Sequence, residues 1–148
     1  MNNKELFANI VKTLHISQDE VTKILKLGNV TDEDIITNAF KECDNETLEG
    51  FLNGFIIYKR GPKEEQPGMT KKVPLSIQLK ENMNNVIFKK LKIAFSLTND
   101  DIVEIFENGN VRLSKNDLTA YLRKEGHKHY RILEEQYLKV FMKGVAGY

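Results

Sequence analysis

The amino-acid sequence contains one pattern twice. Residues 15–30, HISQDEVTKILKLGNV, are echoed by residues 95–111, FSLTNDDIVEIFENGNV. Matching positions pair at a constant offset of 81, beginning with Phe7 and Phe88. The offset becomes 83 after this turn and 90 toward the C-terminal end, so short insertions lengthen the second copy. A chain duplicated in this way is expected to fold as two copies of one unit.

Apolar residues recur at helical spacing in each copy, which predicts four short helices per unit. Ser17 stands three residues before Glu20, a capping box that should open the second helix. Gly28 is predicted to end that helix in the left-handed conformation, which glycine adopts readily. Thr31 with Asp34 is expected to begin the third helix, and Asp44 is expected to cap the fourth.

These spacings divide the chain into a helical repeat at 1–58, a linker at 59–83 and a second repeat at 84–148. Because a unit of about 60 residues is marginally stable alone, the repeats should pack together with approximate two-fold symmetry. The linker has three prolines and two glycines, which exclude a long helix. Its alternating apolar residues from 73 to 79 predict an extended segment or a short strand. The predicted fold is all-α, with two tandem four-helix repeats that have helix-turn-helix-like centres.

Composition restricts the expected cellular setting. No run approaches the roughly 20 apolar residues that cross a bilayer, and the segment Met1 to Ile10 lacks the features of a signal peptide. Cys43 is the single cysteine, so no disulfide can form within the chain. A cytoplasmic protein without membrane contact is therefore expected.

Three segments are similar to those of a known family. FLNGFIIYKRG at 51–61, FKKLKIAFSL at 88–97 and YLRKE at 121–125 resemble the bacterial YehS-like proteins, which are duplicated proteins of unknown function. The resemblance covers nearly the whole chain and implies the same duplicated helical fold, but it supplies no catalytic residue. Such proteins often have a cysteine before the last helix of each copy. Here Cys43 matches that pattern, whereas Leu133 occupies the second position.

Residue patterns for catalysis or metal binding are sparse. His127 and His129 share one loop and have no evident pair of further zinc ligands. The acidic residues at 100–104 fall in the first turn of a predicted helix, where carboxylates complement the exposed amide groups. We therefore expect no cofactor, no metal site and no catalytic residue. An enzyme or small-ligand site at the seam between the repeats is the third-ranked hypothesis.

Charge differs between the two repeats. Residues 1–58 have a net charge of −5, whereas residues 59–83 and 84–148 have +3 each. In the first repeat, the helix after the glycine turn begins with three carboxylates, at 32–34. Phosphate would be repelled there, so the first repeat is not expected to bind DNA.

The corresponding helix of the second repeat presents a basic and polar face. Asparagine and arginine side chains read adenine and guanine edges, and lysine contacts phosphate. Nucleic-acid binding through the second repeat is therefore the leading hypothesis. The alternative is a protein-interaction module, including self-association, driven by the opposed charges of the repeats. The predicted face comprises a helical stripe of Lys115, Asn116, Thr119 and Arg123, followed by Lys124, Lys128 and Arg131.

Overall fold

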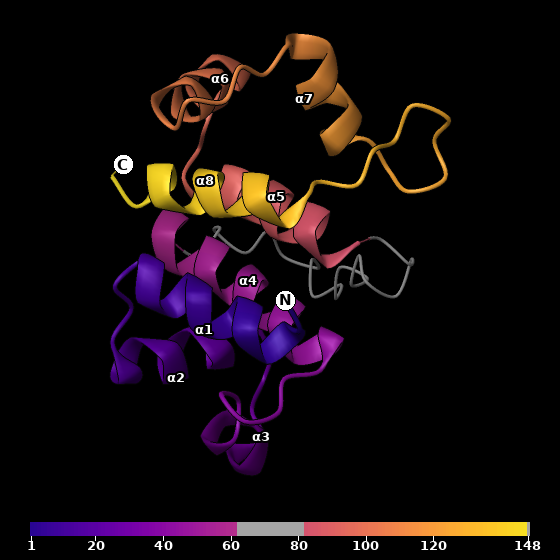
Figure 1. The fold of residues 1–148 in the computed structure, drawn as a ribbon. Helices are drawn as coiled ribbons and strands as arrows, with labels where there is room; N and C mark the ends of the chain where they lie inside the picture. The colour runs from indigo at the N-terminus through magenta and orange to yellow at the C-terminus, as the bar shows by residue number, and fades with distance from the viewer. Residues whose placement is uncertain (62–81, 148) are drawn as a thin grey trace, which may run out of the picture.

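The computed structural model describes residues 1–61 and 82–147, which form eight α-helices (Figure 1). No β-strand occurs in these two ranges, so the described part of the chain is all-helical, as predicted. The segment predicted to run extended, 73–79, lies outside the described residues. The helices are α1 (Asn3–Thr13), α2 (Gln18–Leu27), α3 (Glu33–Thr37), α4 (Asn45–Arg60), α5 (Met83–Ala94), α6 (Asn99–Asn108), α7 (Lys115–Leu122) and α8 (Glu135–Val145).

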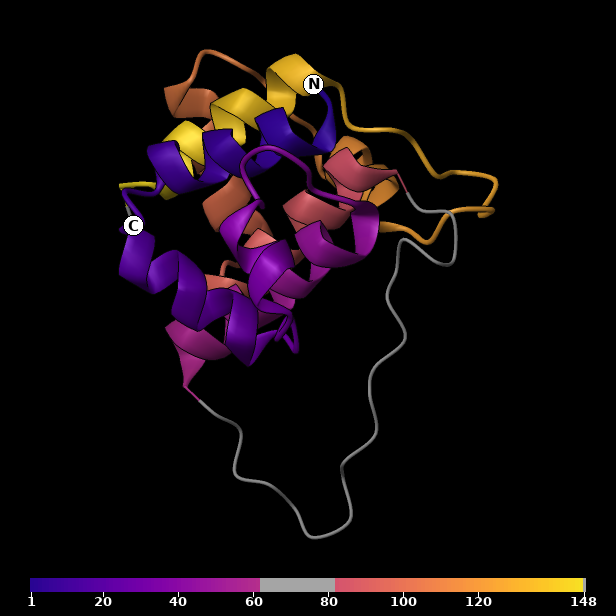
Figure 2. The same ribbon diagram turned by 90° about the horizontal axis from the view of Figure 1, so that it is seen from below.

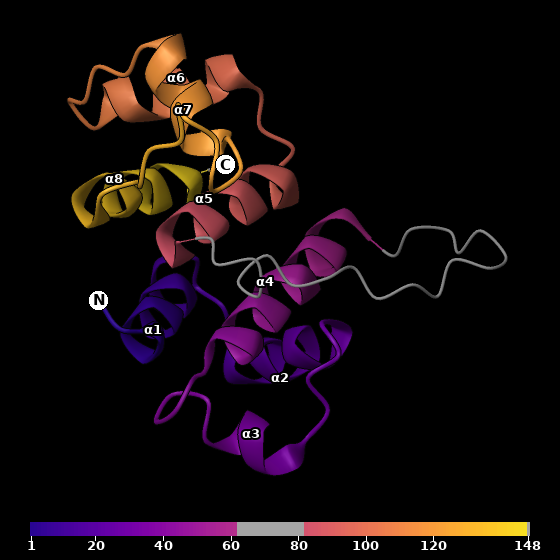
Figure 3. The same ribbon diagram turned by 90° about the vertical axis from the view of Figure 1, so that its right-hand side faces the viewer.

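Four helices form the centre of the molecule, and each repeat contributes two of them. Within the repeats, α1 contacts α4 and α5 contacts α8. Between the repeats, α4 contacts α5 and α1 contacts α8. Exchanging the repeats converts one of these inter-repeat contacts into the other, which is the predicted approximate two-fold symmetry. Helices α2 and α3 lie on one outer side of the centre, and α6 and α7 lie on the opposite side (Figures 1 and 3).

Equivalent aromatic pairs fill the core of each repeat. Phe7 and Phe51 pack edge to face with ring centroids 4.9 Å apart, and Phe88 and Phe141 repeat this arrangement at 4.6 Å. All four side chains are fully buried. Each edge-to-face pair contributes about 0.5–1.5 kcal/mol beyond the burial of its apolar area. The duplication in sequence is thus a duplication of core packing.

The repeats meet through an aromatic contact and a buried ion pair. The ring centroid of Phe55 in α4 lies 5.7 Å from that of Phe95, the C-cap residue of α5. The Glu49 carboxylate in α4 is fully buried, and its Oε2 lies 3.5 Å from Nζ of Lys90 in α5. Because a buried carboxylate is costly without a cation beside it, this ion pair couples the folding of one repeat to the presence of the other.

The turn after α2 differs from the prediction. Asn29 takes the left-handed conformation with φ of 67°, whereas Gly28 has φ of −88°. Asn110 repeats this arrangement after α6 with φ of 62°. The N–H of Val30 then donates to the carbonyl oxygen of Leu25 at 2.9 Å, which closes the turn. The prediction that Gly28 is the left-handed residue is therefore wrong.

Gly28 is required for space rather than for backbone freedom. A Cβ atom on Gly28 would overlap the carbonyl oxygen of Gly50 in α4. A Cβ atom on Gly54 would likewise overlap the carbonyl oxygen of Ile24 in α2. These glycines allow the backbones of α2 and α4 to touch, and side chains of any larger size would separate the two helices.

The third helix begins one residue later than predicted. Asp32, and not Thr31, is the N-cap of α3, and its carboxylate accepts two backbone hydrogen bonds. The N-cap of the equivalent helix α7 is Ser114. Asp32 and Ser114 are 82 positions apart, as are the buried residues Ile36 and Leu118. The offset between these helices is therefore 82, and the predicted offset of 83 is wrong at their start.

The other predicted caps are confirmed. Ser17 and Glu20 form the capping box of α2. The Asp44 carboxylate accepts a hydrogen bond of 2.7 Å from the N–H of Thr47 at the start of α4. Among the described helices, none combines the length and the apolar character needed to cross a membrane.

Candidate functional site

A groove in the second repeat lies between α7 and the connection that leads to α8. This connection, residues 123–134, contains the segment GHKHYR and lengthens the second copy. The groove has a volume of about 520 Å³. Five of the seven residues predicted as a binding face line it, so helix and connection contribute to one site. The full lining is Asn116, Asp117, Thr119, Ala120, Arg123, Lys128, His129, Tyr130 and Arg131.

The two other predicted residues lie outside the groove. Lys115 and Lys124 are both exposed, and Nζ of Lys115 lies 3.8 Å from Oδ1 of Asp100 in α6. A pair of such exposed charges contributes little to stability. Sequence reasoning missed His129 and Tyr130 as lining residues, although the longer connection was a signal that this part of the second repeat is specialised.

Asn85 in α5 anchors the groove from within the core. Its side chain is fully buried. Its amide nitrogen donates to the carbonyl oxygens of Tyr121 and Arg131 at 3.1 and 2.8 Å, and its Oδ1 accepts from the N–H of Leu133 at 2.9 Å. One side chain thus ties the end of α7 to the returning part of the connection. The residue at the equivalent position of the first repeat is Lys4, which is exposed.

Further hydrogen bonds hold both ends of the connection. Nζ of Lys89 in α5 donates to the carbonyl oxygen of Arg123 at 2.9 Å. The N–H of Arg131 donates to the carbonyl oxygen of Ala120 at 3.2 Å. The groove therefore has a fixed wall on the side of the connection, although most of that segment is exposed to solvent.

One carboxylate offsets part of the positive charge in the groove. Oδ1 of Asp117 lies 3.0 Å from Nη1 of Arg131. Hydrogen bonds from Ser114, and to a smaller extent the charge of Arg131, lower the pKa of Asp117, so this carboxylate is ionised at neutral pH. Arg123, Lys128 and Arg131 together with Asp117 give the lining a net charge of +2.

His127 stands beside Arg123 at the start of the connection. Its Nε2 lies 3.2 Å from Nη1 of Arg123, and its Nδ1 accepts a hydrogen bond of 3.1 Å from the N–H of His129. Partial desolvation, and then the charge of Arg123, lower the pKa of His127, so the imidazole is neutral at pH 7. In residues 1–61 and 82–147, no three His, Cys, Asp or Glu side chains come together as a metal site.

Arg123 has an unsatisfied donor. Its side chain is half-buried, and its Nε is shielded from solvent without a hydrogen-bond acceptor among the described residues. Leaving a buried donor unpaired costs about 1–3 kcal/mol. A ligand group or a water molecule that reaches this donor would remove the cost.

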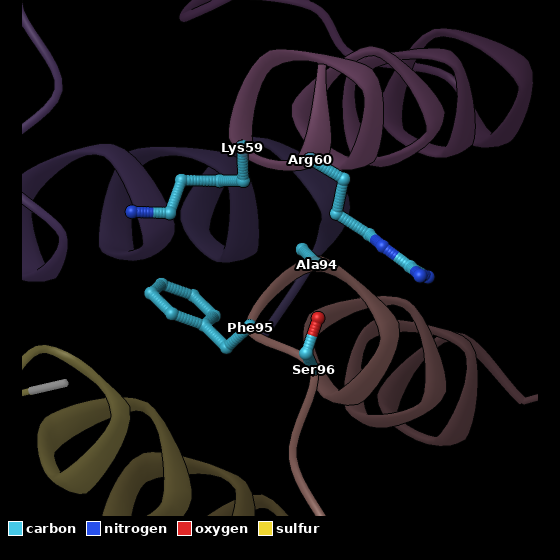
Figure 4. A pocket seen from close by; sticks show the side chains of 5 residues that line it. All are labelled: Lys59, Arg60, Ala94, Phe95 and Ser96. Atoms are coloured by element: carbon cyan, nitrogen blue, oxygen red, sulfur yellow. The ribbon is translucent and has the colours of Figure 1, made fainter. Parts of the chain in front are cut away.

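A second hollow lies at the seam between the repeats, with a volume of about 440 Å³. It is lined by Lys59 and Arg60 at the end of α4 and by residues 94–96 of the second repeat (Figure 4). Nζ of Lys59 lies 4.9 Å from the ring centroid of Phe95. The side chains of Lys59 and Arg60 diverge in Figure 4, so their charges do not converge on a common ligand group. Both instead complement the C-terminal end of a helix dipole.

Cys43 should be chemically inert. Burial, and then the neighbouring Asp44 carboxylate, raise the pKa of Cys43 to about 12. At pH 8 only about one such thiol in ten thousand is a thiolate. We expect iodoacetamide to alkylate the folded protein at least about 100-fold more slowly than free cysteine, and the denatured protein at the free rate. A rate in the folded protein within about tenfold of free cysteine would contradict this burial.

Comparisons with known proteins identify relatives of the chain. The family model described as "Protein of unknown function (DUF1456)" matches residues 2–61 and 84–147, one segment in each repeat. The uncharacterised protein YehS of Escherichia coli (strain K12) is 33% identical over 156 residues, which cover 99% of this chain and 96% of that protein. The resemblance to YehS-like proteins is thereby confirmed. No solved structure matches the chain.

Proposed function

The chain belongs to the DUF1456 family of proteins of unknown function, and we propose that it is a non-enzymatic protein that binds nucleic acid through the groove of its second repeat. The observation that carries this proposal is the convergence on one groove of three cations, with Arg123 at the C-cap of α7 and Lys128 and Arg131 in the connection. Lysine and arginine contacts to phosphate supply most of the affinity of such interfaces. Asn116 and Thr119 add polar groups that can bond to phosphate, sugar or base.

The first repeat supports the proposal by contrast. Its equivalent helix α3 exposes three successive carboxylates, Asp32, Glu33 and Asp34, which repel phosphate. Helices α3 and α7 lie at opposite ends of the molecule (Figures 1 and 3). Binding would therefore be confined to one end, with the acidic end facing away from the nucleic acid.

Charge reversal at Arg123 and Lys128 tests the proposal. We expect the double variant Arg123→Glu/Lys128→Glu to bind a labelled mixed-sequence oligonucleotide at least about tenfold more weakly than the unmodified protein at about 50 mM salt. The reason is that two lining cations become two repulsive carboxylates. Fluorescence anisotropy measures the affinity, and a titration of salt should show binding that weakens steeply toward about 200 mM.

The matched control changes two exposed lysines of α8, Lys139 and Lys143, to glutamate. This control alters the net charge by the same amount without touching the groove. Its affinity should stay within about twofold of the unmodified protein at the same salt concentration. Equal loss of binding in both double variants, or no binding by the unmodified protein, would contradict a site in this groove.

A second candidate function is self-association or docking to a charged protein. The observation that favours it is the opposed charge of the two ends, with acidic residues at α3 and the basic groove at α7. Complementary charges at opposite ends would join copies head to tail. Light scattering of nuclease-treated protein tests self-association. A mass that rises with protein concentration and falls with salt supports self-association, whereas a constant monomer mass excludes it.

A further inference from the structure

We infer that the groove accepts single-stranded nucleic acid, taking about one nucleotide between α7 and the connection, and does not place α7 in the major groove of a duplex. This inference rests on the proposed function and names the form of nucleic acid that the groove recognises. Three observations carry it: the position of the connection beside α7, the unsatisfied donor of Arg123, and the ring side chains of the lining.

The connection lies beside the face of α7 that a duplex would need. Asn116 and Thr119 of α7, together with Arg123 at its C-cap, form one stripe, and this stripe is one wall of the groove. Lys128, His129 and Arg131 of the connection form the other wall. The connection stands out from the helical body beside α7 (Figures 1 and 2). A recognition helix needs free space on both sides to enter a major groove about 12 Å wide, and the connection takes up the space on one side of this stripe.

The dimensions of the groove suit one nucleotide. The stripe from Asn116 to Arg123 spans roughly 10 Å at the helical rise of about 1.5 Å per residue. The volume of about 520 Å³ lies in the range of sites that enclose a single small molecule. A strand that passes through the groove would therefore place one phosphate and its sugar and base between the walls.

Arg123 can hold that phosphate once its guanidinium turns toward the groove. Its Nη1 is beside His127, and Nε has no acceptor within the described part of the chain. The guanidinium edge formed by Nε and Nη2 matches two oxygens of a phosphate in a bidentate hydrogen-bonded pair. A phosphate that draws this edge into the groove would satisfy the unpaired donor and add a charge-assisted contact.

Ring side chains of the lining provide surfaces for a base. His129 and Tyr130 both line the groove, and unpaired bases stack on such rings with little regard to sequence. Bases within a duplex are already stacked on their neighbours and are not available for this contact. The lining therefore favours a single strand over a duplex through contacts that do not depend on charge.

The test compares a labelled mixed-sequence DNA strand of about 12 nucleotides with the duplex of the same length. We expect the single strand to bind at least about tenfold more tightly at about 50 mM salt. Arg123→Lys keeps the charge and removes the fork, so it should weaken single-strand binding about tenfold and change duplex binding by less than about twofold. Asn116→Ala, which alters an exposed side chain, should weaken single-strand binding about threefold without a change for the duplex.

The outcomes distinguish a failure of nucleic-acid binding from a failure of the preference for a single strand. If neither DNA binds at about 50 mM salt, nucleic-acid binding itself fails. If both bind with equal affinity, or if Arg123→Lys and Asn116→Ala both bind the single strand like the unmodified protein, the inference is overturned while the proposed function stands. Thermal unfolding verifies that each variant is folded. If Arg123→Lys does not fold, the comparison of single-strand binding relies on Asn116→Ala.

Discussion

Gly54→Ala should destabilise the protein strongly, whereas Gly144→Ala at the equivalent position of the second repeat should cost clearly less. A Cβ atom on Gly54 would overlap the backbone carbonyl of Ile24, which cannot move without separating α2 from α4. On Gly144 the overlap is with the side chain of Ile105 in α6, which is buried and stiff at χ1 but can shift without moving the backbone of α6. We expect Gly54→Ala to cost about 3 kcal/mol or more, and Gly144→Ala to cost about 1–2 kcal/mol, since the better helix propensity of alanine offsets part of the overpacking.

Urea unfolding followed by circular dichroism measures both free energies. The two glycines are related by the duplication, so each variant is the natural control for the other. At the α2–α4 crossing the added Cβ meets backbone, and at the α6–α8 crossing it meets a side chain. Similar losses of unfolding free energy in the two variants would show that this difference does not matter.

Asn85→Leu should also lower the free energy of unfolding strongly, and the loss of structure should be concentrated at the groove. Leucine fills a similar volume but leaves the carbonyl oxygens of Tyr121 and Arg131 and the N–H of Leu133 without their partner. Each unsatisfied buried group costs about 1–3 kcal/mol, so we expect a loss of about 3–5 kcal/mol. The connection at 123–134 should also become sensitive to trypsin, since four of its residues are lysine or arginine.

Asn84→Ala is the matched control for this variant. Asn84 precedes Asn85 in α5 and is half-buried, and its side chain donates one hydrogen bond of 3.0 Å to the carbonyl oxygen of Leu133. It should cost about 1 kcal/mol and leave the connection resistant to trypsin. A connection that is equally resistant in Asn85→Leu would show that the groove does not depend on this anchor.

Much of the fold could be predicted because its signals are local or repeated. The capping box at Ser17 and Glu20 is contained within four residues, and the aromatic pairs appear at the same places in both copies. Hydrophobic spacing then gives the helices, since a buried face must recur with the helical period. The two-fold packing follows from the instability of so short a unit alone.

The turn after α2 and the start of α3 were predicted wrongly, because contacts between distant residues decide the structure there. Gly28 was expected to be left-handed because glycine commonly has that role after a helix. Its actual constraint is the carbonyl oxygen of Gly50, which sequence spacing does not reveal. Asn29 takes the left-handed position instead, which asparagine tolerates better than most residues. Asp32 replaced Thr31 as the cap because either residue suits that role and only the packing of Ile36 selects the register.

The candidate site was predicted only in part, because one of its walls follows from local spacing and the other from a distant contact. Asn116 and Thr119 of α7 share a stripe with its C-cap residue Arg123 because their spacing is helical. The inward fold of the connection depends on Asn85, which lies far away in sequence and gives no local sign of its role. Sequence therefore indicated which helix carries the polar face, but not that the connection makes this face into a groove.

Mapping amide chemical shifts by NMR during titration with a single-stranded DNA of about 12 nucleotides shows directly which repeat binds nucleic acid. If the second repeat has become the binding unit of this duplicated fold, the largest changes will fall within 116–131. The equivalent acidic region around α3, residues 32–46, will be unaffected. Changes centred on α3 or on the seam residues 59–60 and 94–96, or the absence of any change, would contradict the claim.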